Sequence, residues 1–447
     1  MVASGRTTSK LLIQSYLKLL GLLYILWDVA VSSFSEILMG SIKFTRYRRS
    51  QQLCMKCGVC VSIVKCPGDT DCIGCSSCYL ACPFEAIIPE EVELVSREIP
   101  IWIDDEKVFV PEGITLKIAL ELLGYEFVKF PLDAGPRKIY APCETGGCYS
   151  CAVLVDGILT PLCHTAVREN MKINLDVSNV EPLRIVESFI PHTVGGVGTP
   201  WWIKGKGYIE VACFAAGCNL RCRTCQNFTI TYRSLGKPMT PQEAAELLTK
   251  TRRRYGVDRL AISGGEPTLN RAWLVRFFKE LKRLNPDTKA RLHLDTNTTL
   301  LTRDYIDELV NAGVTDIGPD LKAYTLETFK KITNITDDTY ARKYLETSWD
   351  AVKYMVDNYY PDILFVGIGI PYNREFYKDL EELAKFGETI ARINPELQVC
   401  VLDYRAEFRA QTLRRPTIEE MLTIKKLLND VGLKTVIVQT YLGHFGP

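Results

Sequence analysis

Cysteine is the residue of this chain most able to do chemistry, with 17 among 447 residues against 4 histidines. Fifteen of the cysteines fall into three groups, near residues 54–82, 143–163 and 218–225. Secreted disulfide frameworks belong to short chains that cannot build a core, so this pattern in a long chain argues against one. Short spacings let thiolates converge on one inorganic centre, and triplets with two-residue gaps favour iron–sulfur clusters over zinc.

The first group consists of two consecutive runs of four cysteines, which form an internal repeat. The second run has the C-x2-C-x2-C-x3-C-P spacing of bacterial ferredoxins, and the first has two extra residues before its last cysteine. Residues 51–92 therefore resemble a bacterial-type ferredoxin with two [4Fe–4S] clusters, with a pair of zinc knuckles as the alternative. In that motif the fourth cysteine of each run binds the other cluster. The resemblance implies one cluster on Cys54, Cys57, Cys60 and Cys82, and another on Cys66, Cys72, Cys75 and Cys78.

The second group has the C-x4-C-x2-C…C spacing of plant-type ferredoxins. Residues 100–103 and 107–111 predict a hairpin, followed by a helix over 114–123 and strands over 152–157 and 171–176. This order over residues 93–180 resembles the β-grasp [2Fe–2S] ferredoxins. The resemblance implies one [2Fe–2S] cluster on Cys143, Cys148, Cys151 and Cys163. His164 is expected to be a bystander, with a role as a variant ligand left open.

The third group places Cys218, Cys222 and Cys225 on one loop without a fourth cysteine nearby. A [4Fe–4S] cluster held by three thiolates leaves one iron open to another ligand. This C-x3-C-x2-C loop after a first strand resembles the radical S-adenosylmethionine (SAM) superfamily. The resemblance implies that SAM binds the open iron through its amino and carboxylate groups. One electron then cleaves SAM to a 5′-deoxyadenosyl radical, which abstracts hydrogen from a substrate.

Polar motifs at the ends of later predicted strands match the same superfamily. The motif of Gly264, Gly265 and Glu266 resembles the one that holds the SAM amino group, with Glu266 as acceptor. The triplets Cys225-Gln226-Asn227, Asp295-Thr296-Asn297 and Asp320-Leu321-Lys322 resemble the pyruvate formate-lyase activating enzyme branch. In that branch the last two triplets line the SAM site, and Lys322 would face the SAM carboxylate. A buried ion pair is the alternative for Asp320 and Lys322.

One position departs from the superfamily pattern. Thr224 stands just before the third cysteine, where the family usually has an aromatic residue that contacts adenine. That contact is therefore expected from another residue, and Phe228 is the candidate. The two cysteines outside the groups, Cys213 and Cys400, are expected to be core thiols.

Strands and helices alternate beyond residue 205, which predicts a parallel sheet or barrel with functional residues at the carboxyl ends of its strands. Strands are predicted over 207–214, 259–264, 291–296, 315–321, 363–370, 397–404 and 434–440. Helices are predicted near 241–255, 271–284, 302–312, 339–359, 376–391 and 417–431. The expected fold class is α/β. A partial (βα)6-type radical SAM barrel would follow an α+β ferredoxin module with two [4Fe–4S] clusters and a β-grasp [2Fe–2S] domain.

Five segments are expected along the chain. They are an apolar N-terminal helical segment, 1–50; the two ferredoxin modules, 51–92 and 93–180; a linker, 181–204; and the catalytic domain, 205–447. The longest uncharged run near the N-terminus, Leu19 to Trp27, is far short of the ~20 residues needed to span a bilayer. Internal packing of this segment is expected. The alternative is a peripheral membrane contact through residues 11–49, helped by Lys43, Arg46, Arg48 and Arg49.

The formal net charge of +1 argues against a nucleic-acid partner. The sequence predicts a cytoplasmic radical SAM oxidoreductase fed by an in-chain electron relay, with SAM, three [4Fe–4S] clusters and one [2Fe–2S] cluster as cofactors. A glycyl-radical-enzyme activase is the first hypothesis, with a low-potential electron donor and a glycyl-radical protein as partners. The alternatives are direct action on a small molecule, peptide or membrane lipid, and a non-enzymatic electron-transfer subunit.

Overall fold

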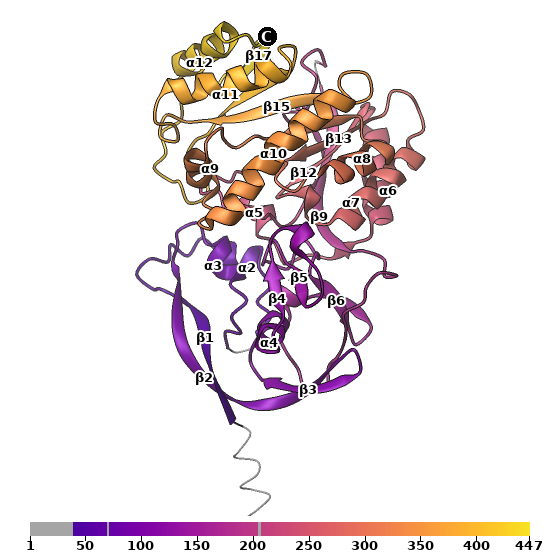
Figure 1. Ribbon diagram of the computed structural model, residues 1–447, viewed down its shortest axis with the longest axis vertical. Helices are drawn as coiled ribbons and strands as arrows, with labels where there is room; N and C mark the ends of the chain where they lie inside the picture. Colours follow the sequence, from indigo (N-terminus) through magenta and orange to yellow (C-terminus); the bar gives the residue numbers. More distant parts are fainter. Residues whose placement is uncertain (1–38, 69–70, 204–206) are drawn as a thin grey trace, which may run out of the picture.

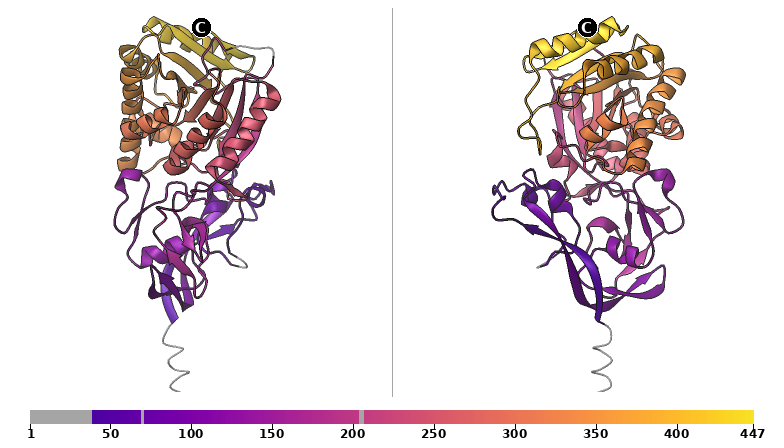
Figure 2. Two further views of the ribbon diagram at one scale, coloured as in Figure 1. Left: turned by 90° about the vertical axis from the view of Figure 1, so that its right-hand side faces the viewer. Right: turned by 60° about the vertical axis from the view of Figure 1, so that its left-hand side comes forward.

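The chain folds into an N-terminal part that carries the first two cysteine groups and a larger C-terminal α/β part (Figure 1). A computed structural model describes residues 39–68, 71–203 and 207–447. The purple N-terminal part lies against one end of the pink, orange and yellow C-terminal part in all the views (Figures 1 and 2). No helix of the described ranges is long and apolar enough to cross a membrane.

The N-terminal part is organised by a long antiparallel pair. Strand β1 (Met39–Arg49) pairs along its length with the first half of β2 (Ile87–Ile103). The first cysteine group lies between these strands in the chain, in loops and in two short helices, α2 (Val59–Ser62) with Cys60 and α3 (Ser77–Ala81) with Cys78. The prediction of a helical segment over 1–50 is thus wrong for residues 39–49, and residues 1–38 lie outside the described residues. Apolar residues of β1 lie opposite apolar residues of β2, as Phe44 does opposite Val92, and Lys43 lies opposite Glu93. Arg48 pairs with Glu90 at 2.7 Å, and such cross-strand pairs suit a strand.

The second half of β2 belongs to the β-grasp unit. It forms the predicted hairpin with β3 (Glu106–Pro111), and the predicted helix is α4 (Leu116–Leu122). The expected boundary at residues 92 and 93 falls inside β2, so the two ferredoxin modules share one strand. The remaining elements are β4 (Glu126–Val128), η1 (Pro131–Asp133), β5 (Lys138–Tyr140), β6 (Ala152–Val155), β7 (Ile158–Pro161), η2 (Leu162–His164) and β8 (Lys172–Asn174).

The C-terminal part is built on a ten-stranded sheet in the order β11-β9-β10-β12-β13-β14-β15-β16-β17-β18. The strands from β10 to β17 are parallel, which confirms the predicted partial barrel. They are β10 (Glu210–Ala215), β12 (Arg259–Gly264), β13 (Arg291–Thr296), β14 (Asp316–Pro319), β15 (Phe365–Tyr372), β16 (Gln398–Asp403) and β17 (Thr435–Thr440).

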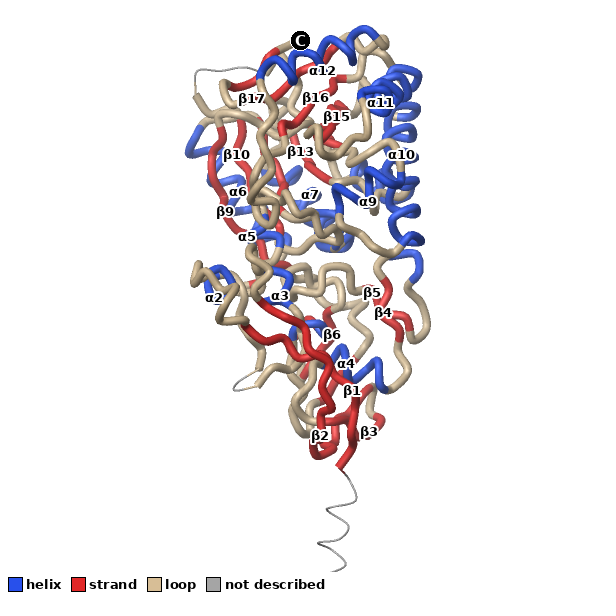
Figure 3. Tube along the Cα trace, turned by 90° about the vertical axis from the view of Figure 1, so that its left-hand side faces the viewer, coloured by secondary structure: helices blue, strands red, loops and turns tan. Residues whose placement is uncertain are grey.

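Helices cover the outer face of this curved sheet (Figures 2 and 3). The six predicted helices are α6 (Pro241–Tyr255), α7 (Arg271–Leu284), α8 (Arg303–Asn311), α10 (Asp338–Asn358), α11 (Leu380–Ile393) and α12 (Ile418–Asp430). Their apolar faces and the sheet form one buried core that includes Trp273 and Phe386. The sequence did not predict α5 (Phe228–Thr231), η3 (Pro267–Leu269) and α9 (Leu326–Thr333).

Antiparallel strands cover both edges of the parallel sheet. Strand β9 (Arg184–His192) pairs with β10 and with β11 (Pro238–Met239), and β18 (Gly443–Phe445) pairs with β17. Residues 184–192 of the expected linker, 181–204, are therefore part of the catalytic sheet. The glycines and proline at 195–200 suggested a connection between domains. The segment before them, β9, instead forms backbone hydrogen bonds with β10, which would otherwise be an edge strand.

Candidate functional site

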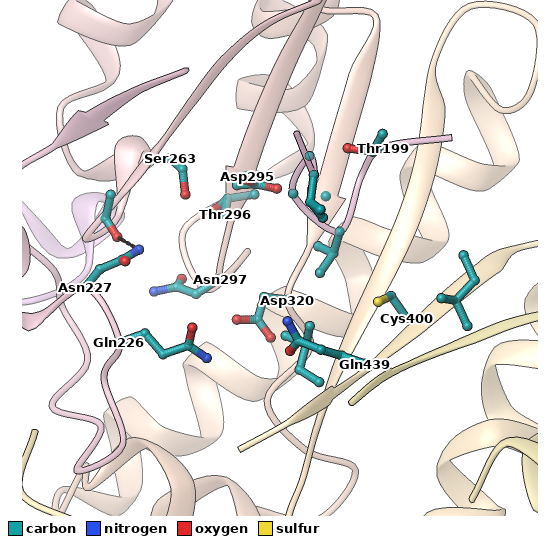
Figure 4. Close-up of a pocket in the computed structure, with 18 of the residues that line it drawn as sticks. Thr199, Gln226, Asn227, Ser263, Asp295, Thr296, Asn297, Asp320, Cys400 and Gln439 are labelled. Carbon is teal, nitrogen blue, oxygen red and sulfur yellow. Dashed lines mark hydrogen bonds between the residues drawn. The ribbon is translucent and has the colours of Figure 1, made fainter. Parts of the chain in front are cut away.

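The third cysteine group and the polar motifs line one cavity of about 720 Å³ inside the partial barrel. Cys218, Cys222 and Cys225 lie on the loop between β10 and α5 and all three contribute to its wall. Figure 4 shows Asn227, Ser263, Asp295, Thr296, Asn297 and Asp320 around the same space. The structure thus brings together the site residues predicted from four separate strand ends, except Glu266.

The three sulfurs suit a metal cluster chemically. Burial raises the pKa of Cys222 to about 12, although Lys322 acts in the opposite direction. Burial also raises the pKa of Cys218 and Cys225. Without metal these sulfurs are therefore neutral thiols, and because ligation requires the thiolate, each would release its proton as a cluster binds. The backbone N–H of Leu220 already donates to the sulfur of Cys218 at 3.3 Å.

The carboxylate of Glu266 is hydrogen-bonded within the protein and does not line the cavity. Its carboxylate is fully buried and accepts bonds from Thr268 N at 2.9 Å, the Thr296 hydroxyl at 2.7 Å and Asn297 N at 2.7 Å. Burial raises its pKa, and these donors offset part of the rise. The cavity wall is formed by Gly264 and Gly265 of the same motif. Glu266 therefore fixes the end of β13, and the backbone before it is what a ligand would meet.

Two asparagines connect the motifs to the cysteine loop. Asn297 donates to Asn219 at 3.1 Å, and its amide nitrogen lies 3.8 Å from the sulfur of Cys218. Asn227, which follows the last cysteine, donates to the carbonyl of Gly264 at 3.0 Å. The cysteine loop and the carboxyl ends of β12 and β13 are therefore held in one hydrogen-bonded network.

Lys322 is a buried cation at the wall of the cavity. It pairs with Asp320 and donates to the hydroxyl of Tyr404 at 2.9 Å. Burial lowers its pKa, but Asp320, Tyr404 and Cys222 together raise it more, so the net pKa of Lys322 lies well above the usual value. Oδ1 of Asp320 has no hydrogen-bond partner among the described residues. Asp320 and Lys322 thus form an ion pair and also line the cavity, so the ion pair does not exclude a ligand-binding role.

Asp295 belongs to a second charged group that extends toward the amino ends of the strands. Its Oδ1 lies 3.0 Å from Nε2 of His293, whose Nδ1 lies 3.8 Å from Glu210. Glu210 also pairs with Arg259 at 2.7 Å. Burial and Arg259 lower the pKa of His293, but the two carboxylates raise it more, so its net pKa is raised. The imidazole of His293 thus lies between the carboxylates of Asp295 and Glu210.

The segment 193–203 passes through the inside of the barrel, which the sequence did not indicate. Gly198 and Val197 pack against Gly318 of β14 and Gly367 of β15, where a Cβ would lie 2.6 Å from the segment. Gln398 donates to the carbonyl of Thr199 at 2.8 Å. Thr193, Val194, Val197, Thr199, Trp201 and Ile203 therefore close one side of the cavity.

The residue proposed to contact adenine is placed elsewhere. Phe228 stacks on Phe408 with ring centroids 4.9 Å apart, in a cluster with Tyr232. Thr224 lines the cavity, and the aromatic side chains in its wall are Trp201 and Tyr404. Tyr404 follows the carboxyl end of β16, where such a sheet carries functional residues, so its position in the sequence could have indicated it. Cys400, expected in the core, is buried but also borders the cavity.

The first cysteine group divides as the ferredoxin motif implies. Cys54, Cys57, Cys60 and Cys82 line a second cavity of about 160 Å³, although Cys82 comes from the other run. Cys66, Cys72, Cys75 and Cys78 also lie close together. Burial raises the pKa of Cys78, and the other three cysteines raise it further. The structure therefore places each fourth cysteine with the other run.

The second group is buried and close-packed. Cys143 lies within hydrogen-bond range of Cys148 and Cys163, and Cys151 within range of Cys163. Thr145 N donates to the sulfur of Cys143 at 3.4 Å. Four buried sulfurs with backbone donors are the ligand set that a [2Fe–2S] cluster requires.

This second group packs directly on the cysteine loop of the catalytic part. A Cβ on Gly217, which precedes Cys218, would lie 2.8 Å from Cβ of Cys148 and 3.0 Å from Cβ of Cys143. Arg184, fully buried, donates to the carbonyl of Ala216 at 2.9 Å and to that of Glu266. The two cysteine groups are thus in contact through the residue before Cys218.

Comparison with known families agrees with this arrangement. Residues 213–387 match the Radical SAM superfamily, and residues 96–177 and 69–88 match a 2Fe-2S iron-sulfur cluster binding domain and a 4Fe-4S binding domain. The chain contains a radical SAM domain joined to ferredoxin-type domains. A radical SAM domain implies SAM and a [4Fe–4S] cluster, and the cavity with its three cysteines could hold both.

Individual relatives share parts of the chain. A protein of Methanococcus aeolicus named "Probable GTP 3′,8-cyclase" is 34% identical over 116 residues, which are 26% of this chain and 38% of that protein. A Methanocaldococcus jannaschii protein with the provisional name glycyl-radical enzyme activating enzyme is 31% identical over 116 residues, 26% of this chain and 40% of that protein. The chain thus spans less than half of either relative. The crystal structure of Streptococcus suis SuiB bound to the precursor peptide SuiA aligns at 14% identity with a TM-score of 0.38, over 50% of this chain and 47% of that one.

Proposed function

We propose that the chain cleaves SAM reductively at Cys218, Cys222 and Cys225, and that its own ferredoxin clusters deliver the electron. The observation that carries this proposal is the packing of the 143–148 loop on Gly217. When bound, the cluster and SAM supply a 5′-deoxyadenosyl radical for hydrogen abstraction. Cluster potentials span roughly −700 to +450 mV, so ferredoxin clusters can supply the low-potential electron that this cleavage needs.

The residues of the chain would hold and shield the reactants. The three thiolates would bind the cluster, and the turn at Gly264 and Gly265 would accept from the amino group of SAM through its backbone. Lys322 would face the SAM carboxylate, because Asp320 and Tyr404 keep it charged and oriented. Segment 193–203 would exclude water from the far side of the cavity.

The proposed target of hydrogen abstraction is a glycine in a partner protein, so that the chain acts as a glycyl-radical-enzyme activase. The triplets at 225–227, 295–297 and 320–322 support this proposal because they resemble the activating-enzyme branch and line one cavity. The relative with the activating-enzyme name supports it as well. The partners would be that glycyl-radical protein and a low-potential one-electron donor, in the cytoplasm.

A small-molecule substrate is the second candidate. The relatives named for a GTP cyclase favour it, and so does the cavity, which segment 193–203 and the C-terminal strands enclose on one side. A peptide or a membrane lipid would need access to the same cavity.

Two measurements test these proposals in order. Anaerobic holoenzyme with SAM and dithionite is expected to release 5′-deoxyadenosine and methionine, and absence of both products would contradict SAM cleavage. The enzyme is then incubated with SAM, dithionite and a glycyl-radical-type protein labelled with deuterated glycine, or with SAM, dithionite and deuterated GTP. If only the labelled protein transfers deuterium to 5′-deoxyadenosine, the result supports the activase. If GTP transfers deuterium, the result supports the small-molecule reaction.

A further inference from the structure

His164 occupies the contact between the two ferredoxin modules. It follows Cys163, one of the four buried cysteines of the β-grasp unit, and lies in η2. Its ring reaches across to residues 65 and 77 of the other module. The sequence suggested a bystander, but the structure gives both of its ring nitrogens a partner.

Both partners of the imidazole adjoin cysteines of the same predicted [4Fe–4S] site. Nε2 lies 2.6 Å from the carbonyl oxygen of Lys65, which is bonded covalently to Cys66. Nδ1 lies 2.9 Å from the hydroxyl of Ser77, whose backbone N–H faces the sulfur of Cys75. The ring is therefore one residue away from two ligands of that site.

These contacts hold the imidazole from both of its nitrogens. A carbonyl oxygen only accepts, so Nε2 carries a proton and donates to Lys65. Nδ1 lies within hydrogen-bond distance of the hydroxyl of Ser77, and the two bonds together fix the ring in position.

The other side of the ring packs on the cysteine loop of the β-grasp unit. A Cβ on Gly146 would lie 2.7 Å from Cβ and 2.9 Å from Cγ of His164. Gly146 lies between Cys143 and Cys148 in the loop that contacts Gly217. His164 thus touches both cluster-binding segments at once.

We infer that His164 is the positioning residue through which an electron passes from the [4Fe–4S] site at Cys66, Cys72, Cys75 and Cys78 to the [2Fe–2S] site. This inference rests on the proposed relay and gives it an order. A low-potential one-electron carrier would first reduce the [4Fe–4S] sites of the ferredoxin module. The electron would then leave the cluster at Cys66, Cys72, Cys75 and Cys78, which is oxidised as the [2Fe–2S] cluster is reduced. From there it would cross the contact at Gly217 to the site at Cys218, Cys222 and Cys225. No proton moves, because Nε2 of His164 keeps its hydrogen bond to Lys65.

The test measures electron transfer in the absence of SAM. Anaerobic oxidised holoenzyme is mixed with photoreduced flavodoxin, and rapid freeze-quench EPR follows reduction of the [2Fe–2S] cluster. For His164→Leu we expect that step to slow about tenfold or more, as for other residues that orient cluster ligands. Iron content and the rate of [4Fe–4S] reduction are expected to stay at the wild-type values.

His164→Gln is the conservative control, because its amide can donate to the carbonyl of Lys65. A rate between those of wild type and His164→Leu supports the inference, and a rate equal to that of His164→Leu overturns it. Equal rates in wild type and His164→Leu also overturn it.

If His164→Leu loses iron or fails to fold, Ser77→Ala decides: slower [2Fe–2S] reduction supports the inference, and an unchanged rate overturns it. Because no SAM is present, failure of SAM cleavage would contradict the proposed function without affecting this readout.

Discussion

Arg221 donates to the carbonyl of Cys143 at 3.0 Å and so ties the catalytic cysteine loop to the [2Fe–2S] loop. The same guanidinium lies 3.4 Å from Glu144, which also pairs with Lys129 at 2.6 Å. Burial would raise the pKa of Glu144, but Lys129, Arg221 and Lys117 lower it to about 2, so the carboxylate stays charged. This charged network holds the two loops in a fixed relation.

Removing the charge at Arg221 should loosen that contact. For Arg221→Met we expect a loss of about 1.5–3 kcal/mol, the usual value of hydrogen bonds to charged groups. The measurement is the midpoint of thermal unfolding under anaerobic conditions. The matched control is Arg223→Met, because Arg223 lies in the same loop but pairs with Glu85 at the surface. Equal midpoints for the two variants would argue against the network.

Substitution of Gly217 tests the contact between the cluster sites. In Gly217→Ala the new Cβ would meet Cys148 and Cys143, so reduction of the catalytic cluster by flavodoxin should slow while cluster content is kept. Gly217 has φ 88°, and alanine there also costs about 1–2 kcal/mol of backbone strain. Gly256→Ala is the matched control, because Gly256 has φ 64° but no atom within 4 Å of its Cβ position. If both variants reduce the cluster at the wild-type rate, the contact has no role in electron transfer.

Lys322 should contribute to SAM affinity through its charge. For Lys322→Met we expect a loss of about 1.5–3 kcal/mol, or roughly 10- to 150-fold in Kd, measured by anaerobic equilibrium binding. Tyr404→Phe removes one hydrogen bond of Lys322 but leaves the charge, and it should weaken binding less. An unchanged Kd in Lys322→Met would remove Lys322 from the SAM site.

The buried His293 should make stability depend on pH in a defined direction. Its pKa is raised, so the stability from the charged imidazole is complete below its ordinary pKa of about 6.5 and is lost as pH rises through the raised value. The difference in unfolding midpoint between wild type and His293→Gln is therefore expected to be larger near pH 6 than near pH 9. A difference that grows toward high pH would contradict a charged His293.

The strand ends show what sequence patterns can predict. Asp295 and Asp320 were predicted from triplets that resemble the activating-enzyme branch, at strand ends where such a sheet carries functional residues, and the structure places both in one cavity. The parallel strands followed from apolar runs separated by helical patterns. Glu266 shows the limit, since its motif was recognised but the direction of its carboxylate depends on donors from β13.

Other features depended on contacts between distant segments. Residues 193–203 read as a linker because glycine permits both a flexible connection and a close approach of backbones. Here Gly198 fits against Gly318, which no local pattern encodes. Strand β1 was included in the predicted helical segment because it follows an apolar run. Its pairing with β2, which no local pattern encodes, makes it a strand.

The most direct test of the in-chain relay counts product from enzyme that has been reduced and then freed of reductant. Fully reduced holoenzyme is desalted anaerobically and mixed with excess SAM, and 5′-deoxyadenosine is quantified per chain. A relay predicts more than one product per chain, because electrons stored on the ferredoxin clusters reach the catalytic cluster. A variant such as Cys151→Ala, which lacks the [2Fe–2S] site, should release no more than about one. A wild-type yield of one or less, with all clusters present and reduced, would contradict the relay.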